Sequence, residues 1–250
     1  MGGVDQRPKK RAARGAKRAP SQGRSRADDR GGAHGGGGGG ATSRPLGPDE
    51  RRDRILDVAI QLAEDGGFDN VRQRDVARLS GVALGTLYKS FRSKEDILAA
   101  ALHRETETLE RRLDRKPARG DTAAERLRAL FVTLTRSLLK KPSYARALLK
   151  AMTSGEEVAT KVVAHQVAVT RMVVAAQRGC PPSELADQEP PTVDEINVAI
   201  YLQNLWFAGL VGWSAKLHGQ QRIVDQVSDA ARLILAGLEA TRGGPADADG

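Results

Sequence analysis

The 250-residue chain is 40% hydrophobic but only 4% aromatic, so its core must consist of Leu, Val, Ile and Ala, which favours helices over an aromatic-rich sandwich or barrel. Its single cysteine, Cys180, excludes an internal disulfide framework and a cysteine-rich zinc site. No apolar run approaches the roughly 20 residues that span a bilayer, and no apolar segment follows the basic N-terminus. We therefore expect a soluble cytoplasmic protein with no membrane partner.

Much of the net charge of +9 lies at the N-terminus, where residues 1–50 hold 11 Lys and Arg against 5 Asp and Glu. Residues 1–47 also contain an unbroken glycine run from Gly35 to Gly40 and almost no apolar side chains. Such a segment cannot offset its conformational entropy by burial, so we predict a disordered basic arm that attracts phosphates without reading sequence. A solubilising tail, a misassigned start site and a transit peptide are the alternatives.

Helical periodicity begins at Pro48. The first predicted helix ends at Gly66-Gly67 and has an apolar face formed by Ile55, Val58, Ala59 and Leu62. Two short helices follow within residues 71–91, the first closed by Ser80-Gly81. Ser93 and Asp96 have the spacing of a capping box at the start of a fourth helix over residues 94–113, which Pro117 and Gly120 end.

The rest of the chain keeps the helical pattern, with apolar residues three and four apart. A proline-rich loop is predicted over Gly179–Pro191, and a disordered tail over residues 241–250. No stretch shows the alternation of a strand, so the predicted fold class is all-α. The later helices are predicted over residues 122–140, 143–152, 156–178, 193–217 and 222–239.

The main functional signal lies between Val71 and Leu98. Two short helices joined by a turn at Ser80-Gly81-Val82 have the dimensions of a helix-turn-helix, whose second helix enters the major groove of DNA. Leu87 and Phe91, four residues apart, are placed to anchor that second helix inward. Gly85 costs about 1 kcal/mol relative to alanine, which a helix tolerates where a partner helix or a DNA backbone approaches closely.

This stretch resembles the TetR family of bacterial transcriptional regulators. The resemblance implies that residues 48–98 are a helix-turn-helix DNA-binding domain and that residues 99–240 are a helical ligand-binding and dimerisation domain. It also implies a homodimeric repressor that a small effector releases from a palindromic operator in double-stranded DNA. The likeness is carried, in order, by Gly66-Gly67-Phe68, Arg74-Asp75-Val76-Ala77, Gly81-Val82, Gly85-Thr86-Leu87-Tyr88, Phe91, Ser93-Lys94-Glu95 and Leu98.

The resemblance also assigns DNA contacts to individual residues. Arginine forks onto the acceptors of guanine, whereas tyrosine, threonine and lysine hold backbone oxygens, so these residue types suit both kinds of contact. The implied contact residues are Arg72, Arg74, Thr86, Tyr88, Lys89 and Lys94.

The chain departs from the family pattern at two of these positions. Arg72 stands where the family usually has threonine, which adds a phosphate contact and leaves Asn70 to cap the following helix. Ser90 replaces an aromatic residue, which weakens one backbone contact. The alternative for Arg72 and Lys89 is a solvated surface charge, the role we expect for Arg78.

Residues 196–213 are apolar on nearly all faces, so this helix must be buried on two sides. One side packs on its own domain and the other meets a second copy of the chain, which places two recognition helices about 34 Å apart on DNA. Closure of a monomeric bundle is the alternative. The residues predicted at the dimer interface are Ile200, Phe207, Leu210, Val227, Ile234 and Leu238.

A ligand cavity is also predicted in this domain. Its predicted lining residues are Phe131, Met152, Tyr201 and Trp206, and ordinary core packing of these residues is the alternative. Within the TetR family, the stretches LKAMTSGEEVA and NLWFAGLVGW resemble the KstR-type repressors of sterol catabolism. That subgroup responds to sterol-derived acyl-CoA thioesters, so the resemblance implies a lipid or acyl-CoA thioester as effector.

Other classes of function have weaker support. The four histidines are scattered, and no nucleophile elbow, phosphate loop or HExxH motif occurs, so we expect no enzyme, no cofactor and no metal site. A ligand-independent nucleoid or architectural DNA-binding protein is the alternative that the basic arm favours. Such a protein has a steep salt dependence and little sequence preference, whereas a repressor protects a discrete operator.

Overall fold

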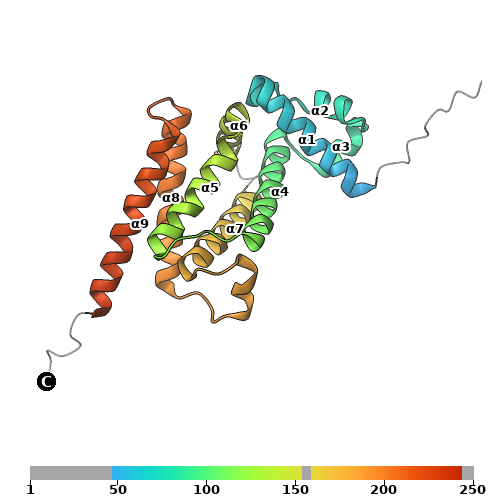
Figure 1. The fold of residues 1–250 in the computed structure, drawn as a ribbon. Helices are drawn as coiled ribbons and strands as arrows, with labels where there is room; N and C mark the ends of the chain where they lie inside the picture. The colour runs from blue at the N-terminus through green and yellow to red at the C-terminus, as the bar shows by residue number, and fades with distance from the viewer. Residues whose placement is uncertain (1–46, 154–158, 244–250) are drawn as a thin grey trace, which may run out of the picture. The chain divides into compact units, whose positions relative to one another are not determined.

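The computed structural model describes residues 47–153 and 159–243, and every regular element within them is helical (Figure 1). The predicted basic arm therefore lies outside the described residues, apart from Gly47, and so do residues 156–158 of the predicted helix 156–178. The elements are α1 Pro48–Gly66, η1 Phe68–Asn70, α2 Gln73–Ser80, α3 Leu84–Ser90, α4 Lys94–Arg115, α5 Ala123–Leu139, α6 Pro142–Met152, α7 Ala159–Arg178, η3 Pro182–Asp187, α8 Val193–Ser214 and α9 Gln220–Gly243.

The predicted helix boundaries of the N-terminal region are confirmed by local chemistry. Pro48 occupies the first turn of α1, and the Glu50 carboxylate accepts a hydrogen bond of 2.8 Å from the backbone N–H of Gly47. Gly81 ends α2 with φ of +72°, in the left-handed region where a residue without Cβ is favoured. The chain can therefore reverse between α2 and α3 within a few residues.

Two hydrophobic clusters hold the described residues together. The first joins α1 to α3 with the start of α4, and it also includes Tyr144, Ala147, Leu148 and Ala151 of α6. The second joins the rest of α4 with α5, α7, α8 and α9, and it includes Ala145 and Leu149 of α6. Since α6 completes the core of the N-terminal region and α4 runs through both clusters without a break, the boundary predicted between residues 98 and 99 is not a structural division.

The second cluster is built around α8, with α9 and α7 packed against it (Figure 1). Trp206 of α8 stands against Phe131 of α5, with ring centroids 6.1 Å apart and planes tilted by 57°. The Trp206 indole N–H donates a hydrogen bond of 2.9 Å to the Thr135 hydroxyl, so its polar atom is satisfied inside the core.

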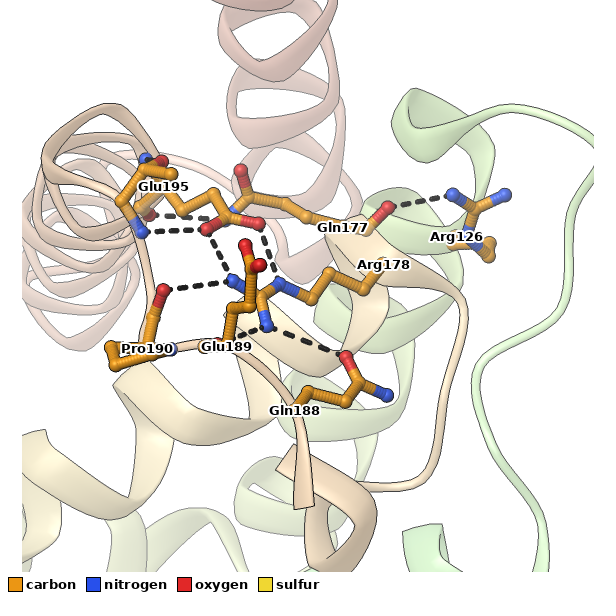
Figure 2. A network of polar contacts seen from close by, with 8 residues as sticks. Arg126, Gln177, Arg178, Gln188, Glu189, Pro190 and Glu195 are labelled. Atoms are coloured by element: carbon orange, nitrogen blue, oxygen red, sulfur yellow. Dashed lines mark hydrogen bonds and ion pairs between the residues drawn. The ribbon is translucent and has the colours of Figure 1, made fainter. Parts of the chain in front are cut away.

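A polar network joins the end of α7 to the start of α8 (Figure 2). Arg178 donates two hydrogen bonds of 2.7 Å to the Glu195 carboxylate and further ones to the carbonyls of Glu189 and Pro190. Arg126 of α5 donates to the carbonyl of Gln177, at the C-terminal end of α7, where a cation is favoured. The bidentate pair lowers the pKa of Glu195 to about 2.

Three details differ from the sequence prediction. The loop over Gly179–Pro191 contains a short 3-10 helix, η3. Helix α9 continues to Gly243, three residues into the predicted tail, whose remaining residues lie outside the described part. Helix α4 runs two residues beyond the predicted end at 113. In the described part of the chain, no helix combines the length and apolarity needed to cross a bilayer.

Candidate functional site

Helix α3 has one buried face and one exposed face. Leu87 is 0% exposed and Phe91 is 1% exposed, which confirms that these two residues anchor the helix inward. Thr86, Tyr88 and Lys89 lie on the exposed side, and Tyr88 is 49% exposed although it is a large aromatic residue. The exposed face thus presents a hydroxyl, a phenol and an ammonium group side by side.

Two arginines at the start of α2, Arg72 and Arg74, are open to solvent. Neither forms an ion pair with any described residue. Arg78 instead pairs with Asp75 at 3.2 Å on the surface, as expected for a solvated charge. The unpaired guanidinium groups of Arg72 and Arg74 are therefore available to an external anion.

Gly85 lies on the exposed face of α3. A Cβ built at Gly85 meets no atom of the described chain within 4 Å, so packing against a partner helix of the same chain is not the reason for a glycine here. The structure removes one of the two explanations that the sequence offered. The remaining explanation for Gly85 is that a DNA backbone approaches α3 closely at this position.

Asn70 does not cap α2, contrary to the sequence interpretation. Its side-chain amide donates a hydrogen bond of 2.9 Å to the carbonyl of Leu62 in α1. The N-cap residue of α2 is Arg72, whose side chain makes no capping hydrogen bond. The sequence spacing was misleading because the glycine turn at Gly66-Gly67 folds Asn70 back onto α1.

Lys94 differs from the other predicted DNA contacts because it already has partners in the protein. Its ammonium group lies 3.8 Å from the centroid of the Phe68 ring and 3.7 Å from the Asp69 carboxylate. The side chain is only 27% exposed. Lys94 therefore ties the start of α4 to η1, and any phosphate contact has to compete with those interactions.

The N-terminus of α4 is held by an ionic contact from the ligand domain. The Ser93 hydroxyl accepts a hydrogen bond of 3.1 Å from the Asp96 N–H, which confirms the predicted cap. The Asp96 carboxylate accepts from the Arg92 N–H at 3.0 Å and forms an ion pair with Lys161 of α7. This pair connects α7 directly to the segment that joins α3 to α4.

An apolar cavity of about 60 Å³ lies between α4, α5, α6, α7 and α8. Met152 and Trp206 line it, as predicted, whereas Phe131 is absent from the lining and supports Trp206 from behind. Tyr201 is 56% exposed and points away from the cavity lining, so its assignment to the cavity is wrong. Helix α8 turns Tyr201 outward because it is five residues from Trp206, which places the two side chains about 140° apart around the helix.

Four polar residues of the cavity were missed by the sequence analysis: Glu105, Thr106, Ser137 and His165. The Thr106 hydroxyl lies 2.8 Å from His165 Nδ1 and 2.8 Å from the carbonyl of Leu102. Burial lowers the pKa of His165 to about 4, so the imidazole is neutral at physiological pH. Burial also raises the pKa of Glu105. Nothing in the sequence pattern pointed to these residues, because they are isolated polar positions on helices that are far apart in the chain.

The predicted interface residues occupy three different environments. Leu210 and Val227 are 2% and 1% exposed in the core of a single chain, so they are not available to a partner. Phe207, Ile234 and Leu238 are half-buried against that core, and Phe207 also lines the cavity. Ile200 is exposed. The exposed apolar residues of α8 are Val193, Ile196, Ile200, Tyr201 and Val211.

Comparisons with known proteins agree with this arrangement. Residues 55–101 match the family model for bacterial regulatory proteins of the tetR family, and residues 120–234 match the tetracyclin repressor-like C-terminal domain. The chain is 30% identical to the transcriptional repressor KstR of Mycolicibacterium smegmatis over 186 residues, which is 74% of this chain and 87% of that protein.

Solved structures show the same fold. A TetR transcriptional regulator from Rhodococcus sp. RHA1 superposes with a TM-score of 0.65 at 23% identity, covering 75% of this chain and 97% of the other. The repressor FadR of Thermus thermophilus, solved with lauroyl-CoA, superposes with a TM-score of 0.57 at 20% identity, covering 80% and 99%.

Proposed function

The chain belongs to the TetR family of bacterial regulatory proteins, and from this premise we propose that it is a homodimeric transcriptional repressor, released from a palindromic operator by a small hydrophobic or acyl-CoA-type effector. The observation that carries the proposal is the position of α6. This helix contributes Leu148 both to the core of the DNA-binding region and to the wall of the cavity.

DNA binding is supported by the exposed face of α3 together with Arg72 and Arg74, which form no ion pair with a described residue. We assign base contact to Arg74 and phosphate contact to Thr86, Tyr88, Lys89 and Arg72. Lys94 contacts phosphate only if it leaves Asp69. A protein of this kind acts on chromosomal DNA in the bacterial cytoplasm, and its function requires no catalysis.

The effector class is supported by the cavity and by the related proteins. The lining is mostly aliphatic and includes the Trp206 ring, which suits a hydrophobic group. The related protein KstR is named as a transcriptional repressor, and the structure of FadR from Thermus thermophilus was solved in complex with lauroyl-CoA. The cavity of about 60 Å³ is smaller than an acyl chain or a sterol, so an effector has to push its walls apart.

That displacement is the proposed switch. The moving walls include α6 and the middle of α4, and both helices pack on α1. A wider cavity therefore shifts the DNA-binding region of each subunit and changes the spacing between the two recognition helices. To release DNA, the effector must favour the non-binding state by several kcal/mol, about 5.5 kcal/mol for a shift from 1:99 to 99:1.

Dimerisation is supported by the exposed apolar residues of α8. Val193, Ile196, Ile200 and Val211 recur at helical spacing on a helix whose other side is in the core. An isologous contact between two copies of this face removes it from water. Sedimentation at micromolar concentration tests this directly, since Ile200→Glu is expected to give monomers.

The proposed function is tested by nuclease footprinting on genomic fragments that include the upstream region of the gene itself, at about 0.15 M salt. A discrete footprint that Arg74→Ala and Tyr88→Ala abolish is the expected result. Uniform coating of DNA that ignores both substitutions, and that deletion of residues 1–45 abolishes, would support the alternative of a ligand-independent nucleoid protein.

A further inference from the structure

One imidazole of the apolar cavity uses only one of its two ring nitrogens within the protein. His165 of α7 lines the cavity, where most of the neighbouring side chains are aliphatic. Its Nδ1 lies 2.8 Å from the hydroxyl of Thr106 on α4. Its Nε2 has no hydrogen-bond partner among the described residues. A polar atom without a partner in an apolar cavity is unusual in a native protein, so it points to a group that enters the cavity.

The contacts of Thr106 determine which ring nitrogen carries the proton. The Thr106 hydroxyl has a single proton, which it donates to the carbonyl of Leu102 at 2.8 Å. The hydroxyl oxygen therefore accepts from His165, and Nδ1 carries the N–H. In the opposite tautomer the hydroxyl proton turns to Nδ1, which leaves two oxygen atoms 2.8 Å apart with no proton between them. The favoured tautomer leaves Nε2 as a bare acceptor.

The imidazole of His165 is neutral at physiological pH. Burial and the neighbouring His103 lower the pKa of His165 to about 4, so Nε2 does not take up a second proton. A charged imidazolium donates from both nitrogens, whereas this neutral ring offers one lone pair. His165 therefore suits a neutral hydrogen-bond donor and has no positive charge to offer an anion.

The other polar residues of the cavity have partners or face water. Thr106 is occupied on both sides by its contacts within α4 and with α7. The Glu105 carboxylate interacts with the Tyr144 hydroxyl. Ser137 is exposed, so water can bind its hydroxyl. The acceptor that remains open to a ligand is Nε2 of His165.

We propose that His165 selects the effector, because its Nε2 accepts a hydrogen bond from a hydroxyl group on the apolar part of that molecule. This inference deepens the proposed function and rests on it, since it takes the cavity as the effector site. A hydroxyl group supplies the proton that Nε2 lacks, in surroundings where water does not weaken the hydrogen bond. An alkyl chain, an ether or an ester leaves Nε2 unpaired and displaces any water from it, which costs affinity. A lipid alcohol is therefore preferred.

The test uses full-length protein and a matched pair of probes, decanol and decyl methyl ether. Both have the same alkyl chain and an oxygen at its end, but the ether lacks the proton that His165 would accept. Binding is followed by tryptophan fluorescence, because Trp206 lines the cavity. The wild type is expected to bind decanol about tenfold or more tightly than the ether.

Two substitutions assign this preference to the imidazole. His165→Phe keeps an aromatic ring and removes the acceptor, so it is expected to bind both probes alike. Thr106→Val keeps His165 and removes the hydroxyl that holds the tautomer. Nε2 can then carry the proton and donate to either probe, so the preference for decanol is expected to fall toward one.

His103→Phe is the matched control, because it removes the neighbouring imidazole, which does not line the cavity. It is expected to keep the preference for decanol. A purely structural role of His165 gives a different pattern, in which His165→Phe lowers the melting temperature and leaves the preference unchanged.

The outcomes separate this proposal from the proposed function. The proposal is overturned if the wild type binds neither probe or binds both alike, if the preference survives in His165→Phe or Thr106→Val, or if His103→Phe loses it. A discrete operator footprint without any preference for decanol supports the repressor function and rejects the hydroxyl site. The expected preference without a footprint supports the hydroxyl site and rejects the repressor function.

Discussion

The DNA-binding region and the effector region of this protein are organised in opposite ways. The groups that we assign to DNA contact lie at or near α2 and on α3, within twenty residues of one another, and they are exposed. The groups that line the proposed effector cavity come from five helices spread between Leu102 and Leu210, and they are buried or partly buried. Local sequence therefore determines the first surface, whereas tertiary packing determines the second. Substitutions in the two regions should affect different measurements.

The largest expected effect is on operator binding. Arg74→Ala removes an exposed, unpaired guanidinium group that we assign to base contact, which is worth about 1–3 kcal/mol, or roughly tenfold to a hundredfold in affinity. The melting temperature should not change, because Arg74 forms no ion pair with a described residue. Fluorescence anisotropy with a labelled operator measures the first quantity. Arg78→Ala, which removes a neighbouring surface arginine paired with Asp75, is the control and should stay near wild type.

The next prediction concerns acid stability and belongs to the effector region. His165 has a folded pKa of about 4 against an ordinary value of 6.5. The unfolded chain binds more protons between those values, so the free energy of unfolding should fall as the pH falls from about 6.5 to about 4. The full contribution is up to about 3 kcal/mol. Thermal melts across this pH range should show the loss, and His165→Gln should flatten it. An unchanged pH profile in the variant would contradict the buried, neutral imidazole.

A smaller effect is expected at the network between α7 and α8. Arg178→Ala removes two charge-assisted hydrogen bonds to Glu195 and should lower the free energy of unfolding by about 1–3 kcal/mol. Because the folded pKa of Glu195 is about 2, the stability from this pair is present above about pH 4.5 and is lost as the pH falls toward 2. Chemical denaturation at pH 7 and pH 3 measures both. Operator affinity should not change, since the network does not touch α1 to α3.

The smallest predicted effect is the most discriminating, because its two parts have opposite signs. Gly85→Ala should stabilise the fold by up to about 1 kcal/mol, since alanine favours a helix and the added methyl group meets no atom of the chain. The same methyl group should weaken operator binding if a DNA backbone approaches α3 there. Melting and anisotropy measurements on one sample test both. Unchanged operator affinity would leave this glycine without a role in DNA binding.

The sequence predicted the DNA-binding region well because its signals are local. The inward positions of Leu87 and Phe91, the turn at Gly81 and the cap at Ser93 all follow from helical spacing and backbone preference. The exception is Asn70, whose side chain binds Leu62 of α1 instead of capping α2. Lys94 shows the same limit, because its contacts with Phe68 and Asp69 depend on a turn of the chain that periodicity does not reveal.

The effector region was predicted as helices but not as a site. The sequence of α8 is apolar on nearly all faces, which predicts burial on two sides of the helix. The pattern does not distinguish the side that faces the core from one that faces a cavity or a partner. Tyr201, Leu210 and Val227 were placed wrongly for this reason.

We propose that the cavity controls DNA binding through α6 and α4. Leu149→Phe tests it most directly, because Leu149 lines the cavity on α6 and the larger ring fills a space of about 60 Å³. Operator affinity would be measured for the wild type and the variant, each with and without lauroyl-CoA. Both proteins are expected to bind the operator alike, and lauroyl-CoA is expected to release only the wild type. Equal release of both proteins, or loss of operator binding together with loss of response, would contradict it.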